Sequence, residues 1–151
     1  MNNFKIDEAK LEDVPALVGL LSELFNIEAD FKPDTGKQVK GLQLLMNATD
    51  RSVIKVARDT NNSVVGMVTA QLVISTAQGA PSAWIEDMVV SSSFRGGGLG
   101  RALLQAAQDW VKAKGATRMQ LLVDTENLPA VGYYHHLGWE STQLQARRLF
   151  F

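Results

Sequence analysis

The stretch Phe94–Leu104, FRGGGLGRALL, places four glycines within five positions, directly before a run with helical spacing. The start of a helix presents unpaired backbone N–H groups and the positive end of the helix dipole, and both favour an anion. Glycine leaves room for a phosphate to approach those amides closely. The stretch therefore predicts either an anion-binding cradle or a tight, flexible turn, and its surroundings must decide between them.

Two phosphate-binding patterns can be compared with this stretch. A P-loop requires Lys and then Ser or Thr after its last glycine, but Arg and Ala follow Gly100. The dinucleotide pattern G-x-G-x-x-G fits Gly98 and Gly100 but has Leu103 at its third glycine, although Asp124 resembles the acid that binds ribose. Residue type therefore excludes the P-loop, whereas a dinucleotide-binding enzyme stays open as an alternative.

Length and composition restrict the classes of protein to which this chain can belong. The 151 residues are 46% hydrophobic and 21% charged, which indicates one globular domain over residues 1–151. The 15 basic and 16 acidic residues leave no charge excess for nucleic acid or a membrane surface. The absence of cysteine excludes a thiol nucleophile, a thiolate metal site and disulfides. We expect a cytoplasmic protein, because the sequence shows no signal-peptide pattern and no bilayer-spanning apolar run.

Apolar periodicity predicts the secondary structure before the glycines. We expect, in chain order, a strand over Phe4–Ala9, a helix from an N-cap at Asp13 to about Phe25, an acidic loop over Asn26–Gly36, a helix over about Val39–Met46, and strands over Ser52–Arg58, Val64–Ser75 and Ala83–Val90. Two asparagines in the turn Asp59–Ser63 indicate a hairpin. Three consecutive strands with short links predict an antiparallel meander.

The residues after the glycines predict a parallel strand pair. We expect a helix from Leu99 to about Lys114 capped by Gly115, a strand over Arg118–Asp124, a helix over about Leu128–Leu137 that stops at Gly138, and one or two closing strands within Trp139–Phe151. A strand, a crossover helix and a second strand should form a right-handed parallel unit. The chain therefore predicts a mixed α/β sheet.

The predicted strand Ala83–Val90 carries two adjacent carboxylates, Glu86 and Asp87, within an apolar run. Regular alternation separates its side chains into two sets, one of Trp84, Glu86, Met88 and Val90 and the other of Ile85, Asp87 and Val89. Burial of an unpaired carboxylate is costly, so the two acids require an explanation. Either they serve chemistry or they pair with an arginine of the core or rim.

Two sets of residues, separated by a predicted helix and strand, match the motifs of a known family. The first is Arg95, Gly98 and Gly100, with Val90 upstream, and the second is Asn127, Ala130, Tyr134, Gly138 and Trp139. In this order and spacing the chain resembles the GNAT superfamily of acyl-CoA-dependent N-acetyltransferases. The resemblance implies an α/β (α+β) fold: a mixed, mostly antiparallel sheet of about six to seven strands flanked by about four helices, with a splayed parallel strand pair at the cofactor site.

The resemblance also implies an N-acetyltransferase that transfers the acetyl group of acetyl-CoA directly to an amine in a ternary complex. The backbone of Met88–Val90 would pair with the pantetheine arm, and the glycine-rich loop would hold the pyrophosphate. The cofactor-binding residues that the family implies are Met88, Val89, Val90, Arg95, Gly96, Gly97, Gly98, Leu99, Gly100, Arg101 and Asn127. For Arg95 and Arg101 the alternative is a solvated surface charge, and for Asn127 it is a helix N-cap.

The family position of the general acid is Tyr134, whose hydroxyl would protonate the CoA sulfur. Its neighbour Tyr133 faces about 100° away on a helix, so only one of the two can occupy the site, and Tyr133 suits core packing. Glu86 corresponds to a position that often serves as general base, directly or through water. Asp87 is the alternative base.

The resemblance also bears on the acceptor. Glu28, Asp30 and Asp34 follow the first predicted helix, a region where the family builds its acceptor pocket, although a solvated loop would explain each acid singly. The Glu-Asp pair before the valine also occurs in the polyamine acetyltransferase branch. Together these acids favour a small cationic amine as acceptor.

Other outcomes stay open. A protein with the same cofactor loop but without efficient acceptor chemistry would be an acyl-CoA-binding sensor or regulatory module. The family resemblance allows a homodimer, and the C-terminal sequence RRLFF could lie at its interface or on the core. His135 and His136 lack metal-ligand spacing, so we expect them at the surface and expect no metal site.

Overall fold

The computed structural model describes residues 3–28 and 31–151. The elements in chain order are β1 Lys5–Glu8, η1 Leu11–Asp13, α1 Val14–Ile27, α2 Thr35–Asn47, β2 Ser52–Arg58, β3 Val64–Ser75, β4 Ala80–Val90, η2 Ser92–Phe94, α3 Leu99–Ala113, β5 Arg118–Leu121 and α4 Leu128–His136. The predicted order of strands and α-helices is confirmed through α4. The expected acidic loop is shorter than predicted, since Asp34 caps α2 by accepting a hydrogen bond from the amide of Lys37 at 3.1 Å.

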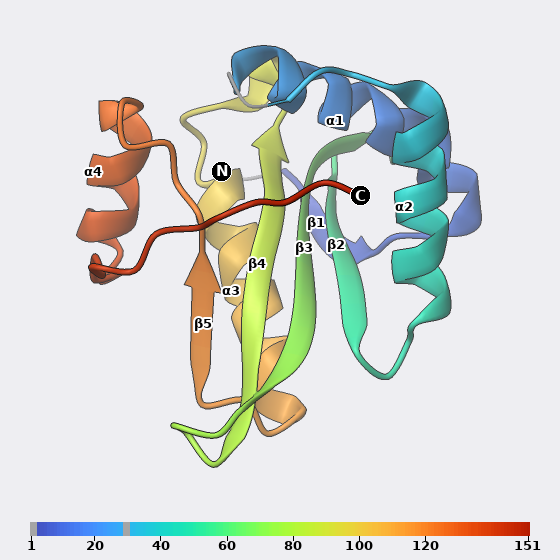
Figure 1. Cartoon of the computed structure of the whole chain (residues 1–151). Coiled ribbons are helices and arrows are strands. Elements are labelled where there is room, and N and C mark those ends of the chain that lie inside the picture. The colour runs from blue at the N-terminus through green and yellow to red at the C-terminus, as the bar shows by residue number, and fades with distance from the viewer. Residues whose placement is uncertain (1–2, 29–30) are drawn as a thin grey trace.

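The strands of the described chain form one five-stranded sheet in the order β1-β2-β3-β4-β5 (Figure 1). Neighbours from β1 to β4 are antiparallel, and β4 pairs with β5 in parallel. These pairings confirm the predicted meander and the parallel unit that α3 connects. The mixed, mostly antiparallel sheet and its four α-helices confirm the expected fold class, with five strands in place of about six to seven.

Two apolar cores lie on opposite faces of the sheet, with α3 behind it and α1 and α2 in front in Figure 1. Leu103 and Val111 of α3 are buried in one cluster with Val68 of β3. Leu17 of α1 and Leu42 of α2 are buried in the other. Each of these three helices buries the apolar stripe that its three- and four-residue spacing creates, which is why the sequence periodicity predicted them correctly.

The segment after α4 departs from the prediction. Residues 139–151 form no strand in the described structure, so the expected closing strands are wrong. The segment instead crosses in front of the sheet in Figure 1, and Arg148 Cζ lies 5.2 Å from the ring centroid of Phe31. Leu149 is 81% exposed and Phe150 is 87% exposed. A strand's register is fixed by burial of one face, and these side chains bury none.

A bulge interrupts the pairing of β3 with β4. The pairs that flank it are Met67–Val89 and Thr69–Glu86. Asp87 and Met88 therefore lie together opposite one residue of β3, and the side-chain alternation shifts by one. Ile85, Met88 and Val90 consequently all contact the core on the α3 side. The predicted grouping of Met88 and Val90 with Glu86 is wrong, because a period of two does not continue through a bulge.

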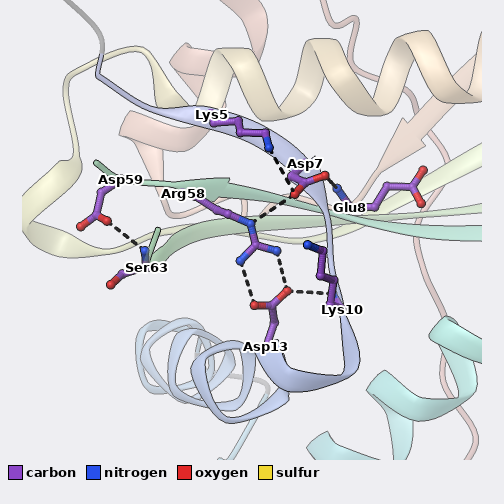
Figure 2. Close-up of polar contacts among 8 residues, drawn as sticks. All are labelled: Lys5, Asp7, Glu8, Lys10, Asp13, Arg58, Asp59 and Ser63. Atoms are coloured by element: carbon purple, nitrogen blue, oxygen red, sulfur yellow. Dashed lines mark hydrogen bonds and ion pairs between the residues drawn. The ribbon is translucent and has the colours of Figure 1, made fainter. Parts of the chain in front are cut away.

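Asp13 occupies the N-cap position of α1, as expected, but its carboxylate makes no capping hydrogen bond to this helix. The two carboxylate oxygens instead accept hydrogen bonds from Arg58 Nη1 at 2.9 Å and Nη2 at 2.7 Å (Figure 2). Arg58 is 4% exposed, and its Nε also donates to Asp7 Oδ2 at 3.4 Å. A buried guanidinium requires a carboxylate partner, and this need outweighs a cap. The pair fastens the start of α1 to β1 and β2.

Candidate active site

The glycine-rich loop leads from the end of β4 into α3. Gly96 has a φ of 82° and Gly98 a φ of 84°, in the left-handed region where a residue with a Cβ is strained. Gly98 is the N-cap of α3, and the first turn of this helix contains no acidic residue. The first amides of α3 have no carbonyl partner within the helix, so the loop has the form of an anion cradle.

Gly100, in the first turn of α3, marks a close approach of three elements. A Cβ built on Gly100 would lie 2.7 Å from Met88 Cε of β4 and 3.1 Å from Tyr133 Oη of α4. A Cβ built on Gly97 would have Phe94 O as its nearest atom, at 3.8 Å. A Cβ at position 100 would therefore displace the end of the Met88 side chain and crowd the Tyr133 hydroxyl, whereas position 97 has space for a methyl group.

Tyr133 is a residue whose position the sequence analysis misjudged. The side chain does not fill the core: Tyr133 is 38% exposed and its hydroxyl lies at Gly100, beside the glycine-rich loop. Burial raises the pKa of Tyr133, and the charge of Arg101 acts in the opposite direction. Helical spacing correctly placed Tyr133 and Tyr134 on different sides of the helix. It gave no indication that the side chain of Tyr133 also lies beside the glycine-rich loop.

β4 and β5 separate next to this loop. Their pairing ends where Ile85 lies opposite Leu121, so residues 86–90 have no partner on β5. This edge confirms the expected splayed parallel pair. Arg95 Nε donates to Val90 O at 2.9 Å, so the arginine that opens the motif holds the loop against the end of β4. The three residues expected to meet the pantetheine arm, Met88, Val89 and Val90, belong to this edge.

Asp87 occupies the bulge of β4 with a φ of 52°, a left-handed conformation that is rare for a residue other than glycine. Its Oδ2 lies 3.5 Å from Thr69 Oγ1 of β3. The pKa of Asp87 is raised to about 6, mainly by burial. The negative charges of Glu86 and Glu28 contribute to this rise, and the hydrogen bond from Thr69 opposes it. The neighbouring Glu86 is exposed.

Tyr134 projects from α4 with its ring partly buried against the α3-side core. The ring meets Trp139 edge to face, with centroids 5.9 Å apart. Burial raises the pKa of Tyr134 to about 12, and the charges of Tyr133 and Glu28 act in the same direction. Glu28, just after α1, thus influences both Tyr134 and Asp87, so the end of α1, the bulge of β4 and α4 converge on one region.

The remaining candidate residues lie at the border of this region. Asn127 Oδ1 accepts a hydrogen bond from the amide of Ala130 at 3.3 Å and caps α4, which is the alternative that the sequence analysis left open. His135 and His136 are exposed. Asp30 lies outside the described residues. Across residues 3–28 and 31–151, no group of three or more His, Cys, Asp or Glu side chains could hold a metal ion.

A groove of about 1150 Å³ follows the outer edge of β5. Trp84 and Glu86 of β4 line it together with the segment after α4, including Arg148. Glu86 therefore faces a space large enough for a small molecule. None of the described helices has the length and apolar composition needed to cross a membrane.

Comparisons with known proteins agree with this geometry. The sequence model of a family described as the acetyltransferase (GNAT) family matches residues 21–139. An uncharacterized N-acetyltransferase of Methanocaldococcus jannaschii is 32% identical over 87 residues, which cover 57% of this chain and 38% of that protein. Streptothricin acetyltransferase of Streptomyces lavendulae is 38% identical over 63 residues, or 38% of this chain and 33% of the relative. The matched region thus spans about a third of the length of these relatives.

Among solved structures, glucosamine-6-phosphate N-acetyltransferase from Arabidopsis thaliana has the same fold. The TM-score is 0.79 at 21% identity, over 99% of this chain and all of that chain (100%). At this identity the likeness concerns the fold alone.

Proposed function

Because the chain belongs to the acetyltransferase (GNAT) family, we propose that it transfers the acetyl group of acetyl-CoA directly to an amine while both substrates are bound. The observation that carries this proposal is the convergence of three features at one end of β4. They are the glycine-rich start of α3, the edge of residues 86–90 that β5 does not pair, and α4, whose Tyr133 hydroxyl lies at Gly100 and whose Tyr134 ring packs on the α3-side core. We include residues 1–151 in this proposal as one acetyltransferase domain.

The residues of the loop fit a diphosphate. Gly98 turns the backbone into α3 without a side chain, and the first turn carries no carboxylate that would repel a phosphate. Gly96 to Arg101 would hold the pyrophosphate on backbone amides, with Arg101 or Arg95 adding charge-assisted hydrogen bonds. The free edge at Met88–Val90 would pair with the amides of the pantetheine arm, and Asn127 would support the cofactor from the start of α4.

The chemistry requires a neutral amine, a polarised thioester and a proton for the departing thiolate. Tyr134 carries its proton at neutral pH, as an ordinary tyrosine does, and burial raises its pKa further, to about 12. It would donate this proton to the CoA sulfur. The acceptor amine loses a proton to a carboxylate of β4, for which the sequence analysis favours Glu86 and offers Asp87.

A cationic amine is the acceptor class that these charges favour. Glu86 and Asp87 of β4 and Glu28 after α1 contribute negative charge to the region that Tyr134 borders. Negative potential raises the local concentration of a cationic substrate. Spermidine and a lysine peptide therefore belong in a test panel, together with glucosamine 6-phosphate as an amine that carries a phosphate.

The proposal is tested by release of CoA thiol from acetyl-CoA in the presence of each amine. We expect acetyl-CoA to raise the melting temperature and at least one amine to release CoA. Tyr134→Phe should reduce kcat by about 10²-fold or more, because the thiolate loses its proton donor. His136→Ala, on the exposed side of the same helix turn, is the control and should keep wild-type turnover.

Two results would oppose the proposal. Unchanged turnover in Tyr134→Phe would remove Tyr134 from the mechanism. Tight binding of acetyl-CoA without turnover on any amine would instead support an acyl-CoA-binding sensor or regulatory module.

A further inference from the structure

Asp87 occupies a position that a regular strand does not provide. Its backbone has a φ of 52°, and it lies in β4 between Glu86 and Val89, the two residues whose pairs with β3 flank the bulge. Bulges next to active sites aim a side chain in a direction that a regular strand would not. Aspartate and asparagine are among the few residues that accept this left-handed conformation.

Thr69 stands behind this carboxylate. It is 1% exposed, its Oγ1 donates to Glu86 O at 3.1 Å, and the same oxygen lies 3.5 Å from Asp87 Oδ2. A hydroxyl has one proton to donate and can also accept. Thr69 can therefore donate to an ionised Asp87, or donate to Glu86 O and accept a hydrogen bond from a protonated Asp87. The Thr69 hydroxyl can thus form a hydrogen bond with Asp87 in either protonation state of the carboxyl group.

The surroundings of Asp87 differ from those of Glu86. Glu86 is exposed and lines the groove along β5. Asp87 is partly buried and faces Glu86 from its own strand, Glu28 from the end of α1 and Thr69 from β3, and Glu28 also acts on Tyr134 of α4. Burial and like charges raise the pKa of Asp87 to about 6, which makes it a stronger base than an ordinary aspartate while it stays ionised at neutral pH.

We propose that Asp87, and not Glu86, accepts the proton of the acceptor ammonium group, and that Thr69 positions the Asp87 carboxylate for this transfer. This inference rests on the proposed acetyl transfer. Asp87 is the catalytic residue, and Thr69 acts through it. Glu86 then attracts the cationic acceptor from the groove without taking its proton.

The protons and electron pairs of this reaction balance. The ammonium nitrogen gives one proton to Asp87, and its freed electron pair forms the C–N bond to the thioester carbon. The C–S bond breaks, and its electron pair leaves on sulfur, which receives the proton of Tyr134. The nitrogen then loses a second proton, which restores Tyr134, and Asp87 returns its proton to solvent. The products are an amide, CoA thiol and one proton.

The test compares the pH dependence of kcat/KM in wild type and four variants, with the best acceptor of the amine panel. The amine's own ionisation contributes equally to every variant, so differences report on the enzyme. Asp87→Asn should lose about 10²-fold or more in kcat/KM and lose the acid limb of the profile. Glu86→Gln should keep the limb and move it to lower pH, since removal of a neighbouring negative charge lowers the pKa of Asp87.

Thr69→Val removes the hydroxyl at nearly constant volume. It should move the acid limb to higher pH, because the ionised carboxylate loses a hydrogen bond. Thr69→Ser keeps the hydroxyl and should keep the limb in place. A merely structural role for Thr69 would change stability in both variants without moving the limb.

The opposite pattern overturns the inference: loss of the limb in Glu86→Gln, with Asp87→Asn retaining at least half of wild-type kcat/KM. A wild-type enzyme that releases no CoA with any amine would instead refute the proposed function. In that case, a pH titration of Asp87 followed by NMR of its carboxyl carbon still tests whether Thr69 stabilises the ionised carboxylate. The titration midpoint must move to higher pH in Thr69→Val, and an unmoved midpoint contradicts the pairing.

Discussion

Gly97 and Gly98 are neighbours in the glycine-rich loop, but the backbone places different demands on them. Gly98 has a φ of 84°, whereas Gly97 lies outside the positive-φ region, and a Cβ there would make only an ordinary contact, 3.8 Å from Phe94 O. Gly98→Ala should therefore destabilise the protein by about 1 to 2 kcal/mol and weaken acetyl-CoA binding. Gly97→Ala is the matched control and should change the free energy of unfolding by less than about 0.5 kcal/mol.

Urea unfolding of the two variants and titration with acetyl-CoA check this prediction. Equal losses of stability in Gly97→Ala and Gly98→Ala would show that the left-handed conformation of Gly98 is not required.

Asp87 should reduce the stability of the fold while it serves the reaction. Its folded pKa of about 6 lies above the ordinary value of 3.8, so the folded state binds the proton more tightly than the unfolded state. The ionised carboxylate therefore destabilises the fold at neutral pH, by roughly 2 to 3 kcal/mol at 1.36 kcal/mol per pH unit. This penalty disappears as the pH falls below the unfolded value.

Asp87→Asn keeps the shape of the side chain and tolerates the same backbone conformation. We expect it to melt roughly 5 °C above wild type near pH 7 and at the same temperature as wild type near pH 3, where Asp87 is protonated in both the folded and the unfolded state. Scanning calorimetry across this range measures the difference. A variant less stable than wild type at neutral pH would contradict the assignment of a strained, destabilising carboxylate.

Residue spacing predicted the elements that surround the candidate site. Gly98 and Gly100 lie at the start of α3 beside Met88 of β4, and the ring of Tyr134 packs on the same core as Met88. Spacing could not reveal that Asp87 sits in a bulge, because the bulge depends on the register with β3 and not on the sequence of β4 alone. It also could not reveal that Thr69, distant in sequence, lies behind Asp87.

At the scale of elements, the junction of β1, β2 and α1 depends on the pair Asp13–Arg58. Removing one partner of a buried ion pair leaves an uncompensated charge and typically costs about 3 to 5 kcal/mol. Asp13→Asn should therefore destabilise the protein by about 3 kcal/mol. Lys5→Ala is the control: Lys5 is 74% exposed and 3.9 Å from Asp7, so its loss should cost less than about 1 kcal/mol.

The stabilisation by Asp13 also depends on pH. The hydrogen bonds from Arg58 hold the pKa of Asp13 below its ordinary value, so its contribution is complete above about pH 4 and is lost as the pH falls through the lowered pKa. Urea unfolding of wild type and Asp13→Asn should show a difference at neutral pH that shrinks in acid. A constant difference would mean that Asp13 acts by packing alone.

Most elements followed from periodicity because α1, α2, α3 and the central strands each bury a face. α3 illustrates this, since its buried leucines, alanine and valine recur at helical spacing. The start of α1 did not follow in detail. Asp13 suited an N-cap by residue type, but the buried Arg58 of β2 competes for its carboxylate, and that competition is visible only in three dimensions.

At the scale of the whole molecule, the sheet order and the splayed β4–β5 pair place the glycine-rich loop beyond the end of β4, beside the part of this strand that carries Glu86 and Asp87. The strand order could be predicted from the sequence, because the links are short and one crossover helix joins the parallel strands. The course of residues 139–151 could not be predicted, because exposed apolar residues such as Leu149 and Phe150 fix no register on the sheet. That segment lines the groove which Glu86 faces, so the shape of this groove is the property least accessible from sequence.

The most direct test of the account is to follow a carbon-labelled acetyl group from acetyl-CoA by NMR, in the presence of the wild-type protein and the amine panel. The account predicts that the label appears as the carbonyl carbon of an amide on a cationic amine, in an amount equal to the CoA released, and that Tyr134→Phe slows its appearance by about 10²-fold or more. Label that remains on acetyl-CoA with every amine, although acetyl-CoA binds, would contradict acetyl transfer.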